Sequence, residues 1–173
     1  MKYLILTIKS WNIRNAANLK EKYPVEIISN KDDLTLEILE KINPRYIFIP
    51  HWSWIIPDEI INKYECIIFH MTDLPFGRGG SPLQNLISHG IYETKISALK
   101  ATNEVDAGPI YMKLPVSLCG SAEEIYMRLS KIIFNEMIPY IIEKEPDPVP
   151  QEGEIVFFKR RNQMREIFQP LEI

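Results

Sequence analysis

The stretch that decides the fold is residues 44–70, which read PRYIFIPHWSWIIPDEIINKYECIIFH. It contains two apolar runs, 46–49 and 66–69, on either side of the segment 57–64, which begins with a proline. Uninterrupted apolar runs of this length are typical of parallel strands, because helices cover such strands on both faces. Proline is favoured in the first turn of a helix. The stretch therefore predicts a strand–helix–strand unit of a parallel sheet.

The same alternation continues along the rest of the chain. Further strands are expected at 3–8, 25–28, 94–99, 110–116 and 155–158, and further helices at 11–23, from 32 or 33 to 42, at 82–90 and at 122–141. Capping boxes are expected at Ser81 and Ser121, and a kink at Pro139. This order predicts an α/β fold of the Rossmann-like kind, with an open, twisted, mostly parallel sheet and helices on both faces.

The composition of the chain is that of an ordinary globular protein. Its 173 residues carry 20 Lys and Arg against 23 Asp and Glu, a net charge of −3. This balance excludes a broadly basic surface for nucleic acid, although it leaves a local basic patch open. Neither a signal peptide nor an 18-residue apolar run is present, and the two cysteines lack metal-ligand spacing. We therefore expect a cytoplasmic protein that does not contact a membrane.

The turn after the first strand, residues 7–11, contains no glycine. A dinucleotide pyrophosphate needs glycine at this turn so that the backbone can approach it. The chain also has no GxxxxGK[ST] segment. Both observations argue against nicotinamide-dependent enzymes and P-loop enzymes.

The residues suited to chemistry lie in two segments, 69–82 and 103–110. His70 ends an expected buried strand, at the edge where open α/β sheets bind ligands, and two adjacent glycines precede the next helix. Asp106 follows in the second segment, and a carboxylate beside an imidazole orients the ring and favours its protonated form. The alternative interpretation is structural: a glycine turn, a histidine that only ends a strand, and an ordinary Asp-Ala-Gly turn.

Several separated motifs resemble those of one enzyme family. His70, Leu74-Pro75, the Arg-Gly-Gly-Ser-Pro segment at 78–82 and Asp106-Ala107-Gly108 match, in order and spacing, the catalytic domain shared by methionyl-tRNA, glycinamide-ribonucleotide and nucleotide-sugar formyltransferases. The resemblance covers about residues 45–161, and the segment 153–161 is most similar to the nucleotide-sugar members. It implies a formyltransferase-like catalytic domain at 1–144, followed by a linker, a returning strand and a tail at 145–173.

The resemblance implies a transferase that moves a formyl group from N10-formyltetrahydrofolate to the amine of a small metabolite, with a nucleotide-linked amino sugar as the preferred acceptor. We expect no nucleic acid partner, because a tRNA acceptor would need a basic face and the net charge is −3. The resemblance leaves a homodimer open. His70 would stabilise the developing oxyanion and relay a proton, and Asp106 would orient His70 and favour its charged form. The site implied for the folate includes Trp52, Trp54, Gly79, Gly80, Ser81, Asn103, Glu104 and Val105, and that for the acceptor includes Arg78, Gln84, Arg160 and Arg161.

One position departs from the family pattern. The family's catalytic triad is Asn, His and Asp, and Ile68 stands where the family has the Asn. In the family that amide donates a hydrogen bond to the oxyanion formed during transfer, and loss of one such donor costs about 10²–10³ in rate. We expect His51 or Thr72 to supply the missing donor, since His51 follows the strand predicted to lie beside that of His70. In the alternative, His51 and the two tryptophans that follow it line the pocket or pack in the core.

Ile68 also leaves two other functions open. One is a formyltransferase-like domain that binds a folate or a nucleotide without catalysis, and the other is an enzyme with the same scaffold and a different carbon donor. No metal is expected, because His51, His70 and Asp106 lack the short spacing of metal ligands.

Overall fold

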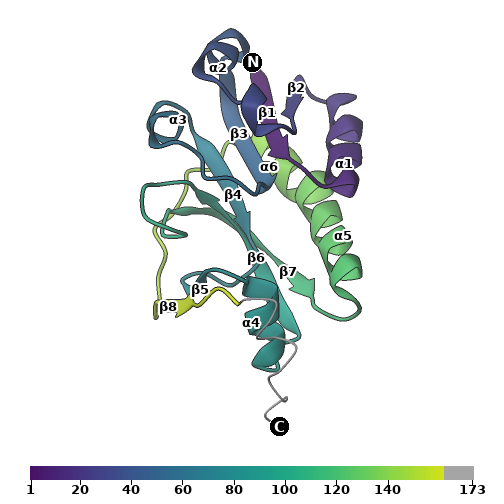
Figure 1. The fold of residues 1–173 in the computed structure, drawn as a ribbon, viewed down its shortest axis with the longest axis vertical. Helices are drawn as coiled ribbons and strands as arrows, with labels where there is room; N and C mark the ends of the chain where they lie inside the picture. The colour runs from purple at the N-terminus through teal and green to yellow at the C-terminus, as the bar shows by residue number, and fades with distance from the viewer. Residues whose placement is uncertain (162–173) are drawn as a thin grey trace.

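The computed structural model describes residues 1–161, which form a six-stranded sheet with the strand order β2-β1-β3-β4-β6-β7 (Figure 1). These strands are β1 Lys2–Thr7, β2 Val25–Ile28, β3 Pro44–His51, β4 Cys66–His70, β6 Glu93–Lys100 and β7 Ile110–Ser117. The first four strands pair in parallel, and β6 and β7 pair antiparallel. The predicted α/β fold with a mostly parallel sheet is thus confirmed.

Helices cover the sheet on both faces, as predicted. They are α1 Ser10–Lys20, α2 Leu36–Ile42, α3 Asp58–Lys63, α4 Pro82–Ser88, α5 Ala122–Ile132 and α6 Ile138–Lys144, with a short 3-10 helix at Lys31–Asp33. Alternate residues of β1 belong to two separate cores. Tyr3 and Ile5 pack in the core that α1, α5 and α6 cover, whereas Leu4 and Leu6 pack in the core under α2 and α3. No helix within residues 1–161 is long and apolar enough to span a membrane.

One predicted helix start and one predicted capping box differ from the structure. The second helix begins at Leu36, because the Thr35 hydroxyl caps it by accepting the Ile38 N–H at 3.2 Å. The capping box at Ser121 is confirmed, but the one at Ser81 is wrong. The Ser81 hydroxyl instead accepts the backbone N–H of Arg161 at 3.0 Å, so a distant segment occupies it.

The expected disruption near Pro139 takes the form of a π-helical turn, Ile133–Met137, between α5 and α6. Proline has no N–H to donate to the preceding turn, and π-helical turns occur mostly as single turns inside α-helices, as here. Ile133, Phe134 and Met137 of this turn are all buried in the core.

A second, small sheet lies next to α4 (Figure 1). Its strands are β5 Phe76–Gly79 and β8 Val156–Phe158, which pair in parallel. The returning strand was expected, but β5 was not, because two of its four residues are glycines, which weaken a strand; both have a positive φ in the structure. Residues 162–173 of the expected tail lie outside the described residues.

Candidate active site

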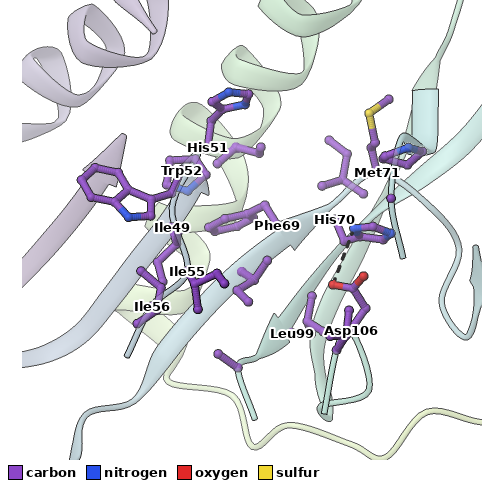
Figure 2. A pocket seen from close by; sticks show the side chains of 18 of the residues that line it. Ile49, His51, Trp52, Ile55, Ile56, Phe69, His70, Met71, Leu99 and Asp106 are labelled. Atoms are coloured by element: carbon purple, nitrogen blue, oxygen red, sulfur yellow. Dashed lines mark ion pairs between the residues drawn. The ribbon is translucent and has the colours of Figure 1, made fainter. Parts of the chain in front are cut away.

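A cavity of about 740 Å³ opens at the carboxyl ends of β1, β3 and β4 (Figure 2). Ligands bind at this edge in open α/β sheets. Its walls come from the turn after β1, from residues 49–61 after β3, from the end of β4, from 79–82, from 99–106 and from one face of α5. A volume of this size suits an organic ligand of several hundred daltons.

His70, the last residue of β4, faces this cavity and is only 9% exposed. Its Nε2 lies 2.7 Å from the carbonyl oxygen of Gly77. A carbonyl only accepts hydrogen bonds, so Nε2 carries a proton and donates it. In the neutral ring Nδ1 is therefore the basic nitrogen, and it lies 3.8 Å from Oδ1 of Asp106 (Figure 2).

Asp106 lies in the loop between β6 and β7, and its side chain is 13% exposed. Its Oδ2 accepts the backbone N–H of Gly79 at 2.9 Å, which leaves Oδ1 facing His70. Gly79 has a φ of +99°, and a Cβ there would lie 2.5 Å from the carbonyl oxygen of Phe158. Glycine is therefore required where β5 holds the carboxylate. The structure brings the predicted His–Asp pair together.

Residues 13–138 match the protein family described as formyl transferase. The chain belongs to this family. The family match extends further toward the N-terminus than the motifs that carried the resemblance in the sequence, and it includes β2 to β4.

Members of the family with solved structures include a protein named methionyl-tRNA formyltransferase from Clostridium thermocellum. The two are 56% identical with a TM-score of 0.93, over 95% of this chain and 74% of that one. The methionyl-tRNA formyltransferase of Dictyoglomus turgidum is 28% identical over 142 residues, which cover 78% of this chain and 45% of the relative. The chain spans less than half the length of this curated relative.

The formyltransferase PseJ from Anoxybacillus kamchatkensis shares the fold, with a TM-score of 0.72 over 97% of this chain and 89% of that one, but only 18% identity. The sequence was expected to be most similar to sugar formyltransferases. That expectation needs correction, since the methionyl-tRNA formyltransferases above have the higher identities. The segment 153–161 misled because a few residues of a short strand carry little information about a branch of the family.

Ile68, which stands where the resemblance implies an asparagine, lines the cavity with an apolar side chain. Of the two predicted substitute donors, Thr72 is wholly buried, and its hydroxyl donates to the Gly77 carbonyl at 3.2 Å. The hydroxyl proton of Thr72 is thus donated to the same carbonyl that binds His70, so the geometry does not favour Thr72 as a hydrogen-bond donor to the substrate.

His51, the other candidate, lines the cavity at the end of β3. The strand register pairs Ile49 with Ile68, so His51 and His70 end neighbouring strands, as predicted. Figure 2 shows the two imidazole rings well apart from each other. Burial, together with the nearby Lys9 ammonium, lowers the pKa of His51, so that its ring is neutral at pH 7.

The residues predicted to bind the folate all line this cavity. Trp52 and Trp54 pack edge to face, with ring centroids 4.9 Å apart. Nε1 of Trp52 is buried and has no hydrogen-bond partner among the residues that the structure describes. A buried donor normally has a partner, so this N–H is suited to an acceptor atom of a ligand.

Of the four residues predicted to bind the acceptor, Arg160 alone lines the cavity. Arg78 is 6% exposed and donates from Nε and Nη2 to the side chain of Gln151. Arg161 donates to side chains of α4, and Gln84 lies on the exposed face of that helix. These three residues thus do not line the cavity themselves: the Arg78 and Arg161 side chains bind other residues of the fold, and the exposed Gln84 lies next to Tyr126.

Sequence reasoning missed three polar residues around the site. Asn12 is 5% exposed and lines the cavity from the start of α1; its position just after β1, at the ligand-binding edge, was a signal. Nδ2 of Asn85 lies within 3.1 Å of three backbone carbonyl oxygens, two of them in the turn before α4. Gln151 contacts the Asp106 loop from the linker. Nothing in the local sequence marks Asn85 or Gln151.

Proposed function

We propose that the protein transfers a formyl group from N10-formyltetrahydrofolate to a primary amine. The observation that carries this proposal is the basic Nδ1 of His70, which faces both the cavity and the carboxylate of Asp106 in a member of the formyl transferase family. An unprotonated nitrogen next to a fixed carboxylate is suited to hold a proton during transfer.

The residues of the cavity fit a folate. Aromatic and apolar side chains cover much of its wall, and these suit a flat ring system; they include Trp52, Trp54, Ile49, Ile56 and Leu99. The buried Nε1–H of Trp52 offers a hydrogen bond to a heteroatom. HypX from Aquifex aeolicus, which shares the fold at a TM-score of 0.75 and 22% identity, has a structure in complex with tetrahydrofolic acid. The folate supplies the formyl carbon to which the acceptor nitrogen becomes bonded.

In this transfer the acceptor amine loses one proton, and the nitrogen that releases the formyl group gains one. His70 can take up the proton at Nδ1, because Nε2 keeps its own proton on the Gly77 carbonyl. The carboxylate of Asp106 stabilises the imidazolium that results, and the Gly79 N–H holds that carboxylate in place. His70 can then return the proton without rotating its ring.

Negative charge develops on the formyl oxygen, and Ile68 has no proton to donate to it. His51 supplies this donor in our proposal. Its lowered pKa keeps the ring neutral near pH 7, and a neutral imidazole still has one N–H to donate.

The acceptor we propose is the amino group of methionyl-tRNA. The 56% identity to a protein of that name supports it, and the exposed Arg160 at the rim of the cavity gives a local contact for phosphate. A nucleotide-linked amino sugar is the second candidate. The overall charge of −3 favours a small acceptor, and the structure of PseJ contains a UDP-linked formamido sugar and tetrahydrofolate.

Mass spectrometry of the products distinguishes these acceptors. The purified protein is incubated with N10-formyltetrahydrofolate and either methionyl-tRNA or UDP-linked amino sugars, with His70→Ala as the control. We expect a mass increase of the acceptor by one formyl group, which the control does not produce. Folate binding without turnover on any amine would contradict the proposal and would favour the binding-domain alternative.

A further inference from the structure

The side chain of Gln151, in the linker after α6, uses its whole hydrogen-bonding capacity on two distant segments. Its Oε1 accepts from Arg78 Nε at 3.1 Å and from Arg78 Nη2 at 2.8 Å. Its Nε2 donates to the carbonyl oxygens of Asp106 and Gly108, each at 2.8 Å. The partners fix the orientation of the amide, because a guanidinium only donates and a carbonyl only accepts.

These contacts join the two halves of the candidate active site. Three consecutive residues of β5 each bind one residue of this group. The Gly77 carbonyl accepts from His70, and the Arg78 side chain donates to Gln151. The Gly79 N–H donates to the Asp106 carboxylate. The Asp106 side chain is thus tied to β5 directly, and its backbone is tied to the same strand through Gln151.

The Asp106 backbone needs such support. Its φ is +51°, in the left-handed region that residues with a side chain rarely adopt. The residues just before it, 102–105, are exposed, and Val105 is 64% exposed, so little packing holds the loop from that side. The two carbonyl groups that Gln151 binds flank the Asp106–Gly108 turn.

We propose that Gln151 is a positioning residue, which holds the backbone of Asp106 so that the carboxylate stays against Nδ1 of His70. This inference rests on the proposed function of the His70–Asp106 pair. In this proposal the hydrogen bonds that Gln151 Nε2 donates hold the Asp106 backbone in position. The hydrogen bonds from Arg78 to Oε1 only fix the orientation of the Gln151 amide.

Two substitutions separate these two halves of the amide. Gln151→Glu keeps the acceptor for Arg78 as an ion pair but replaces the donor by an oxygen that repels the two carbonyl groups. Gln151→Met has similar size and removes both halves. If Gln151 only tethered the linker to β5, the Glu variant would behave as the wild type. Glu152→Gln, at an exposed neighbouring position, is the control.

The experiment measures kcat and KM for N10-formyltetrahydrofolate, the thermal midpoint, and the hydrogen exchange of the Gly79 amide, which Asp106 protects. We expect both Gln151 variants to lower kcat by about 10², as a displaced catalytic group does, with a smaller change in KM. We also expect faster exchange at Gly79 while the Glu variant keeps its thermal midpoint. Wild-type kcat and wild-type exchange at Gly79 in Gln151→Glu would overturn the inference. The exchange measurement needs no turnover, so it tests Gln151 even if no acceptor is formylated.

Discussion

Replacing Asp106 by Asn tests the proposed mechanism most directly. Asparagine has the same shape, and its amide oxygen can still accept the Gly79 N–H that the carboxylate accepts at 2.9 Å. The loop therefore keeps its anchor, and the substitution removes only the negative charge next to His70. The neutral amide also offers its N–H₂ to Nδ1, which stabilises the unprotonated ring.

The size of the effect follows from the distance between the two groups. At 3.8 Å and an effective dielectric constant of about 20, the attraction between an imidazolium and a carboxylate is about 4 kcal/mol. Because this attraction exists only when His70 holds the proton, it stabilises the step in which the proton is held. Its loss corresponds to a decrease of about 10³ in kcat.

The assay is single-turnover formylation at saturating donor, with product measured by mass spectrometry and with the thermal midpoint as the folding control. We expect Asp106→Asn to lose about 10³ in rate, to unfold near the wild-type temperature and to bind the folate with unchanged affinity. A rate within threefold of the wild type would show that Asp106 does not act through its charge.

Four further predictions concern other parts of the protein. His51→Ala should lower kcat by about 10²–10³, and adding Ile68→Asn should recover part of that loss; an unchanged rate in the single variant would remove His51 as the donor. Because burial lowers the pKa of His51, the unfolded state binds more protons, so stability should fall as the pH decreases below about 6.5, and this slope should be smaller in His51→Asn. Burial raises the pKa of Cys66 to about 12, so iodoacetamide at pH 8 should label the exposed Cys119 of the native protein, and both cysteines only in denaturant. Gly79→Ala should lower the thermal midpoint and the rate together, because the added methyl group would meet a carbonyl oxygen at 2.5 Å; a wild-type midpoint would argue against that steric requirement.

Local patterns predicted the main sheet well. The apolar runs at 46–49 and 66–69 became β3 and β4, because a strand covered on both faces shows its burial directly in its sequence. The pairing of His70 with Asp106 was also predictable, since both follow from the edge of that sheet and from the family motifs.

Contacts between distant segments were not predictable from such patterns. Ser81 stands at a position typical of a helix cap, yet its hydroxyl accepts the backbone N–H of Arg161, which lies 80 positions later in the chain. The family resemblance implied that Arg78 contacts the acceptor, but its side chain donates to Gln151 inside the fold. In each case the partner is a polar residue in a linker or tail, where the sequence has no periodicity to place it.

The pairing of β8 with β5 affects the order in which the core and the candidate active site form during folding. The buried apolar residues of both cores lie at or before Ile142, whereas the strand that pairs with β5 and the side chain that binds the Asp106 backbone belong to residues 151–158. During folding, the core can therefore form before the site does. Local opening of this last segment would uncouple His70 from Asp106 while the main sheet stays folded. Activity should accordingly disappear at a lower denaturant concentration than the signal of the core.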